Sequence, residues 1–187
     1  MSVFLLWLFA ITKRANHKKY FDFNSELMAS SLENERLNAL AISILLSKSI
    51  KNCYVTQNHE ICMNAAKEFI GIIGHIPKYK DVNIHMHNAD VISLARSWDD
   101  TKFGDNLSGF RYMLNDIKNN MQSLSGIEVG RCGMFIRGIS PIFFENKFMG
   151  SLEVMLNFSA LDDVAKKSLY IKPKYIKCKF TAKFTEI

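Results

Sequence analysis

The sequence lacks the short motifs that mark the common enzyme classes. It contains no G-x-S-x-G, no phosphate-binding P-loop and no H-E-x-x-H, which build a nucleophile elbow, a phosphate cradle and a zinc site respectively. No cysteine and histidine are arranged as a convincing nucleophile and base. These absences favour a binding protein over an enzyme.

Paired cysteines are also missing, because no C-x-x-C occurs. Zinc ribbons and dithiol redox motifs are therefore excluded. The four cysteines are Cys53, Cys62, Cys132 and Cys178. A bridge between Cys53 and Cys62 would form in an oxidising compartment, but small buried thiols are the favoured interpretation.

No apolar run is long enough to cross a membrane unaided. "SVFLLWLFAIT" is followed at once by "KRANHKK", whereas a span needs about 20 apolar residues and a secretory signal places its charges first. Residues 1–15 are therefore predicted to be the second half of a transmembrane helix. A short interfacial anchor and a buried helix are the alternatives.

The net charge of +6 is concentrated at the two ends of the chain. Since the middle is nearly balanced and carries no recognition motif, we expect no nucleic-acid partner. Residues 166–187 are basic and have no settled periodicity. They predict a solvated tail, or a reading frame lost near Lys167.

Hydrophobic periodicity predicts an α+β domain, in which helices precede consecutive antiparallel strands. Asp105 is the expected N-cap of the third helix. The predicted helices are 24–50, 59–73 and one within 104–122, and the predicted strand regions are 82–87, a hairpin within 125–144, and 150–159. Within the hairpin, Gly130 and Gly133 predict a turn or a bulge.

Four sequence pieces occur in order within residues 80–160: "HMH" from His85 to His87, "RSW" from Arg96 to Trp98, "KFGDNLSGFR" from Lys102 to Arg111, and "SGIEVGRCG" from Ser125 to Gly133. With them the chain resembles the Cache-type sensor regions, and more narrowly the double-Cache regions, of bacterial methyl-accepting chemotaxis proteins and sensor kinases.

The resemblance implies a stalk helix followed by a PAS-like antiparallel sheet with flanking helices and a ligand pocket. It also implies a homodimeric receptor at the inner membrane, with residues 16–165 as a periplasmic sensor domain between the anchor and the tail. The chain departs from the family by having no second span and no room for a complete second module. The function expected is ligand sensing for chemotaxis. Alternatives are the sensor part of a histidine kinase or of a cyclic-dinucleotide enzyme, and a zinc-binding periplasmic module.

Arginines and aromatic side chains in these pieces predict the ligand. A guanidinium fork suits a carboxylate, and an aromatic wall is typical of small-molecule pockets. We therefore expect a small carboxylate or amino acid as the partner, with no cofactor and no metal. The expected ligand-binding residues are His85, His87, Arg96, Trp98, Phe110, Arg111, Glu128 and Arg131.

Two of these assignments leave alternatives open. His85 and His87 share a strand face, so they bind ligand, hold a metal or serve as buried structural histidines. Glu128 either lines the pocket or simply pairs with an arginine, because ion pairs without a function are common. The strand periodicity also places Arg131 and Arg137 on one face with Phe135 and Ile139.

Overall fold

The computed structural model describes residues 3–131 and 133–167. Residues 35–158 form one unit that holds the whole sheet, and residues 3–34 with 159–167 belong to a second unit. The helices are α1 (Val3–Ser49), α2 (Lys51–Thr56), α3 (His59–Ile73), the 3₁₀ turn η1 (Pro77–Tyr79), α4 (Tyr112–Asn120) and α5 (Ser159–Lys167).

Five antiparallel strands form one sheet in the order β2-β1-β5-β4-β3. Their bounds are β1 (Asn83–Asn88), β2 (Ser93–Arg96), β3 (Leu124–Gly130), β4 (Gly133–Phe144) and β5 (Lys147–Leu156). The α+β prediction is confirmed, as is the turn between Gly130 and Gly133. The strand predicted at 82–87 is confirmed as β1, in which Met86 faces Cys53 and both histidines face Glu153, although both faces are buried. Strand β2 was not predicted, because its four residues are too few to show a period.

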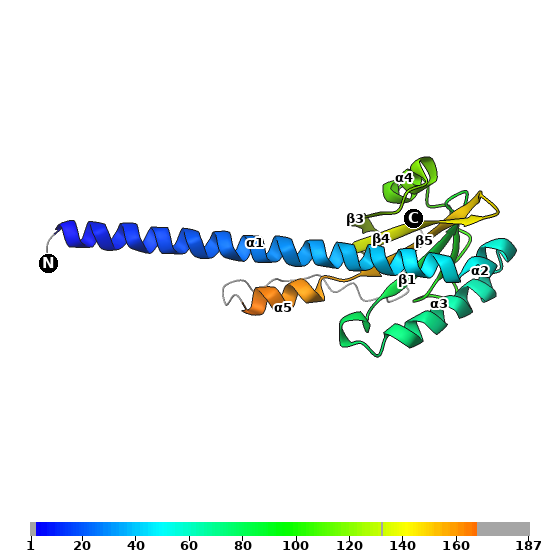
Figure 1. Ribbon diagram of the computed structural model, residues 1–187, viewed down its shortest axis with the longest axis horizontal. Coiled ribbons are helices and arrows are strands. Elements are labelled where there is room, and N and C mark those ends of the chain that lie inside the picture. Colours follow the sequence, from blue (N-terminus) through cyan, green and yellow to red (C-terminus); the bar gives the residue numbers. More distant parts are fainter. Residues whose placement is uncertain (1–2, 132, 168–187) are drawn as a thin grey trace, which may run out of the picture. The chain divides into compact units, whose positions relative to one another are not determined.

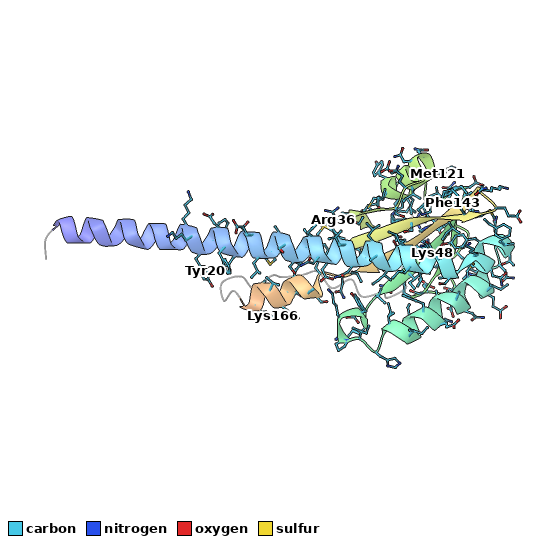
Figure 2. All side chains as sticks on the ribbon, viewed as in Figure 1. Tyr20, Arg36, Lys48, Met121, Phe143 and Lys166 are labelled. Carbon is cyan, nitrogen blue, oxygen red and sulfur yellow. A yellow bond between two sulfur atoms is a disulfide. The ribbon has the colours of Figure 1, made fainter. Side chains whose placement is uncertain are left out.

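Helices cover both faces of the sheet. Within residues 35–158, α4 lies on one side and α2 and α3 lie on the other (Figure 1). On the α4 side, Leu114 and Ile117 of the helix pack with Leu107 and Ile139 in a buried cluster. Figure 2 labels Met121, the left-handed residue that ends α4.

The end of α1 approaches the sheet through small side chains. Ala39 and Ser43 are fully buried, and the Ser43 and Ser140 hydroxyls are 2.8 Å apart. A Cβ added at Gly138 would collide with the backbone of Ala39. The long helix was predicted correctly, but Leu37 on its expected apolar face is 51% exposed. The face that packs on the sheet carries small residues instead, because the backbones of α1 and β4 lie too close together for a large side chain.

The third predicted helix begins later than expected. Helix α4 starts at Tyr112, with Arg111 at the N-cap position. Asp105 is not an N-cap, so that prediction is wrong: its carboxylate accepts hydrogen bonds from Arg96, at 2.6 and 2.8 Å. A charge-assisted pair binds this carboxylate more strongly than free backbone amides would.

Cys53 and Cys62 form a disulfide between α2 and α3. The favoured prediction of free thiols is therefore wrong, although both side chains are buried as expected. Residue periodicity could not show that the turn at Gln57 and Asn58 brings the two cysteines together. Next to Cys53, the Tyr54 hydroxyl donates to the carbonyl of Ser151 on β5 at 2.7 Å, so the bridged pair is anchored to the sheet.

No helix in the described part of the chain combines the length and hydropathy needed to cross a bilayer. The predicted anchor, residues 1–15, lies in α1 from Val3 onward. It remains a prediction. The predicted basic tail, residues 166–187, begins in the last two residues of α5, which ends at Lys167. Its remainder, residues 168–187, lies outside the described residues, and the proposed loss of reading frame remains a prediction.

We predict that replacing both Cys53 and Cys62 by alanine lowers the free energy of unfolding by about 2–3 kcal/mol, because the bridge restricts a short loop of the unfolded chain. Denaturant unfolding measures this change. Reductant should lower the stability of the native protein and leave the double variant unchanged. Equal sensitivity of the two proteins to reductant would contradict the bridge.

Candidate functional site

A cavity of about 480 Å³ opens on the face of the sheet opposite the end of α1. Its floor comes from β1, β4 and β5, and its wall comes from the loop between β2 and α4. The lining residues are His85, Arg96, Trp98, Asp99, Thr101, Lys102, Phe103, Asp105, Leu107, Phe110, Arg111, Gly130, Arg131, Phe135, Arg137 and Met155.

The structure brings most of the expected ligand-binding residues to this cavity. Those that line it are His85, Arg96, Trp98, Phe110, Arg111 and Arg131. His87 and Glu128 do not line it. His87 is fully buried in the sheet, and both oxygens of Glu128 are engaged, one by the Arg111 guanidinium at 2.6 Å and one by the backbone amide of Met113 at 3.0 Å.

The centre of the site is Glu153, which the sequence analysis did not select. Its side chain is completely buried in the middle strand of the sheet. One oxygen, Oε1, accepts from Nη2 of Arg111 and from Nη1 of Arg137, both at 2.5 Å. Burial raises the pKa of Glu153, but the charges of Arg137 and Arg111 outweigh burial and hold this pKa well below its usual range.

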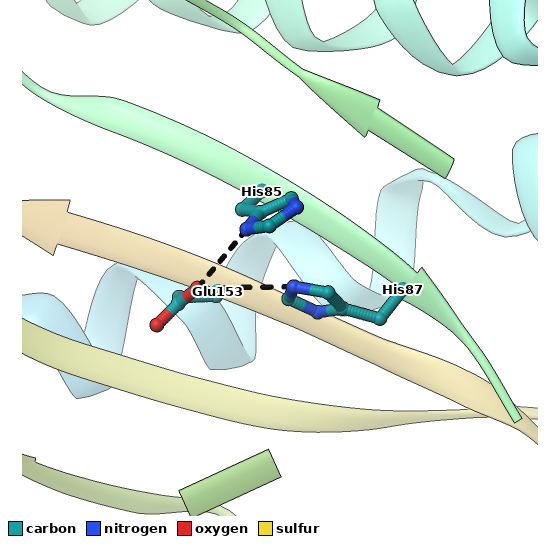
Figure 3. Close-up of side chains that lie close together, drawn as sticks. All are labelled: His85, His87 and Glu153. Carbon is teal, nitrogen blue, oxygen red and sulfur yellow. Dashed lines mark ion pairs between the residues drawn. The ribbon is translucent and has the colours of Figure 1, made fainter. Parts of the chain in front are cut away.

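The second oxygen of Glu153 faces the two histidines, as Figure 3 shows. Oε2 is 3.5 Å from Nδ1 of His85 and 3.8 Å from Nε2 of His87. Burial lowers the pKa of His85 to about 4 and lowers the pKa of His87 well below its ordinary value. Both imidazoles are therefore neutral at pH 7, and their outer nitrogens pair with serine hydroxyls, at 2.9 Å to Ser93 and 3.2 Å to Ser151.

Three potential metal ligands converge at this point. One atom each from His85, His87 and Glu153 lies within 4.8 Å of the other two. Within the part of the chain that the structure describes, the buried atoms Nε2 of His87 and Oε2 of Glu153 have no hydrogen-bond partner. These side chains would hold a divalent cation, although the two arginines on the other Glu153 oxygen would repel it.

A second ion-pair group fixes the wall of the cavity. Asp105 accepts from Arg96 and, at 3.3 Å, from Nη1 of Arg131, and Arg96 also donates to the carbonyl of Lys102 at 2.7 Å. The guanidinium of Arg131 lies 4.8 Å above the ring of Phe110. One carboxylate thus serves two arginines.

The lining of the cavity is electropositive. It holds five basic side chains and two carboxylates, and Glu128 and Glu153 behind it raise the number of acidic groups to four. Among residues 3–131 and 133–167, no group accepts a hydrogen bond from Nη1 of Arg111 or from Nη2 of Arg137. Two guanidinium groups at the floor therefore retain unused donors.

The sequence analysis missed Glu153 because of its position in an alternating strand. Glu153 stands between Leu152 and Val154, which define the apolar face of a strand, so alternation places it on the opposite face. The only available signal was the unusual density of arginines elsewhere, since buried arginines require carboxylate partners.

We predict that Glu153→Gln lowers the free energy of unfolding by about 3–5 kcal/mol, because it leaves Arg111 and Arg137 buried without their shared counter-charge. The matched control is Glu145→Gln in the exposed turn between β4 and β5. Denaturant unfolding compares the two variants. A loss of stability at Glu153 no larger than at Glu145 would contradict this role.

Comparison with known proteins agrees with this architecture. A family model described as the double sensory domain of two-component sensor kinases matches residues 26–168. No curated protein matches the chain.

Three solved sensor domains have the same fold. That of the V. cholerae histidine kinase DctB has a TM-score of 0.59 at 16% identity, over 80% of this chain and 58% of its own. That of E. coli DcuS gives 0.52 at 15%, over 73% and 98%. The ligand-binding domain of the Campylobacter jejuni chemoreceptor Tlp3, in complex with 4-methylisoleucine, gives 0.59 at 15%, over 82% and 63%.

The chain thus spans about three-fifths of the DctB and Tlp3 domains. Identities this low show the fold alone. The family model carries the assignment, since it covers well over half of the sequence. The chain belongs to the family of double sensory, Cache-type domains of two-component sensor kinases.

Proposed function

We propose that the cavity binds a small molecule with a carboxylate group, either a simple organic acid or an amino acid. The observation that carries this proposal is the pair of unused guanidinium donors, on Arg111 and Arg137, at the floor of an electropositive cavity. A carboxylate would satisfy both donors, and its single charge would match the one basic side chain in excess over the whole lining and the two glutamates behind it. Both guanidinium groups line the cavity, so their unused donors are available to a bound acceptor.

The rest of the lining supports a partly apolar ligand. Trp98, Phe103, Phe110, Phe135 and Met155 present ring and thioether surface around the arginines, the usual composition of a small-molecule pocket. Asp99 and Asp105 are the lining carboxylates that an ammonium group would reach. The amino-acid ligands of Tlp3, isoleucine and L-valine, are compatible with such a pocket.

Ligand binding alone would produce the signal, and the ligand would not be chemically changed. Arg137 faces the cavity, and the next residue, Gly138, contacts the backbone of Ala39 in α1. A ligand that accepts a hydrogen bond from Arg137 would shift the equilibrium between two packings of β4 against α1, the stalk helix. This route needs no catalytic group, and we propose a non-enzymatic receptor domain.

We further propose that the domain lies on the periplasmic side of the inner membrane, anchored by the start of α1, as a homodimer. The disulfide supports an oxidising compartment. Within residues 35–49, Leu37 and Leu45 are 51% and 68% exposed on α1, which supports pairing with a second copy. Light scattering of the purified protein measures the dimer.

We propose that this sensor controls chemotaxis, because the four sequence pieces resemble those of methyl-accepting receptors. A histidine kinase is the alternative that the description of the family model supports, and a cyclic-dinucleotide enzyme is the third. The cytoplasmic module of the whole receptor distinguishes them. Methylation-type coiled coils there would support chemotaxis, and a kinase module would overturn it.

A zinc-binding module is a second candidate function, favoured by the convergence of His85, His87 and Glu153. It is the weaker candidate on electrostatic grounds. The charges of Arg111, Arg137, Glu128 and Glu153 already cancel in a buried site, and a divalent cation would add two uncompensated charges. Metal analysis of the purified protein tests it, since a stoichiometric metal would favour this candidate.

We predict that one member of a panel of amino acids and small mono-, di- and tricarboxylates stabilises the protein by about 2.7 kcal/mol at 100 times its Kd. Arg131→Ala should weaken that ligand about tenfold, because a charge-assisted contact at the rim is lost. Thermal unfolding and calorimetric titration measure these effects.

The matched control is Lys147→Ala, which removes an exposed charge in the β4–β5 hairpin, away from the cavity. It should leave both stability and affinity unchanged. Equal affinities of the Arg131 and Lys147 variants would refute the assignment of Arg131. A folded protein that responds to no carboxylate would refute the ligand class.

A further inference from the structure

One histidine outside the cavity contacts the loop that forms its wall. His59 is the first residue of α3, and its imidazole stacks on Phe103 with ring centroids 3.7 Å apart and an interplanar angle of 12°. Phe103 lines the cavity. The wall loop, residues 97–106, thus leans against a histidine that the ligand itself would not touch.

Both ring nitrogens of His59 face backbone carbonyl oxygens. Nδ1 is 2.7 Å from the carbonyl of Leu94 in β2, and Nε2 is 3.0 Å from the carbonyl of Asp100 in the wall loop. A carbonyl oxygen only accepts, and a neutral imidazole carries a single N–H. Only the imidazolium donates at both positions, whereas the neutral ring would set a lone pair against one of the oxygens.

The position of His59 is fixed independently of the loop. The Asn58 side chain caps α3 by accepting from the backbone amide of Ile61 at 3.1 Å. The disulfide fastens Cys62, one turn further on, to α2. The imidazole therefore extends from a rigid base, whereas residues 100–104 of the wall loop are exposed.

The charges around His59 do not supply another reason for its position. In the described ranges no carboxylate forms an ion pair with its ring, and the nearby Asp100 side chain pairs instead with Lys67 of α3, at 3.6 Å. The neighbouring side chain Glu60 is exposed. The dipole of α3 disfavours a cation at this helix end, so the two carbonyl oxygens are the acceptors that a doubly protonated ring would meet.

We propose that His59 is a positioning residue of the ligand pocket, and that its protonated ring latches the wall loop closed so that the pocket responds to pH. Histidine changes charge between about pH 5 and pH 8. In acid the latch bridges β2 and the loop. In alkali one of its two bonds is lost, and the exposed tip of the loop around Asp100 loosens, while Arg96 still binds Asp105 and the carbonyl of Lys102 at the base of the loop.

If the cavity binds a ligand as proposed above, the latch should make ligand affinity fall as pH rises, and this consequence rests on the proposed function. The latch itself can be tested without a ligand. Trp98 is in the wall loop, and Trp7 is the only other tryptophan. In a Trp7→Phe background, Trp98 reports opening of the loop through quenching of its fluorescence by acrylamide. His85, which meets Trp98 edge-on at 5.4 Å, does not titrate in this range, since burial lowers its pKa to about 4.

We expect the quenching constant of Trp98 to rise by a factor of about two between pH 5 and pH 8. His59→Gln should be strongly quenched at both pH values. His59→Arg, which stays charged and keeps several donors, should be weakly quenched at both. The control His75→Gln removes an exposed histidine just after α3 and should behave like the parent.

Circular dichroism establishes that each variant is folded, and the His59→Arg variant keeps the test decisive if His59→Gln unfolds. A pH-independent parent would overturn the latch. So would a pH response that survives in His59→Arg or disappears in His75→Gln. A failure of all carboxylates to bind, with the His59-dependent quenching intact, would refute the proposed ligand class and leave the latch standing.

Discussion

The buried carboxylate of Glu153 is the constraint on which this domain depends. A charge in the middle strand of a sheet is tolerated only if opposite charges meet it, and Arg111 and Arg137 do so at 2.5 Å. Arg111 comes from the start of α4 and Arg137 from β4, so one ionised group ties a helix and two strands together. Glu128 and the two histidines complete this network, and the cavity opens directly above it.

Strand β4, which carries Arg137, also joins the cavity to α1, the stalk helix. In β4, alternate residues face opposite sides of the sheet: Arg137 and Ile139 face α4, whereas Gly138 and Ser140 face α1. The side chain missing at Gly138 lets the two backbones touch. A displacement of β4 on the cavity side would therefore be transmitted to α1 through backbone contact rather than through flexible side chains.

The sequence predicted the local features well, because helix and strand periods depend on near neighbours. The helix at 59–73, the alternation from Val82 to His87 and the hairpin at Gly130 were all readable from spacing. Errors arose where a distant partner changes the outcome. Asp105 was predicted to be a helix cap, but its carboxylate binds Arg96. Cys53 and Cys62 were predicted to be free thiols, but the short turn between α2 and α3 places them close enough to form a disulfide.

By itself the sequence determined the fold class, the family resemblance and the types of side chain available for a pocket, since these depend on pattern and composition. Only the tertiary structure decided which of those side chains meet. It placed Arg96, Trp98, Phe110, Arg111 and Arg131 around one cavity, moved His87 and Glu128 behind it, and put Glu153 at its base. Ion pairing across strands depends on sheet order and register, which no single strand encodes.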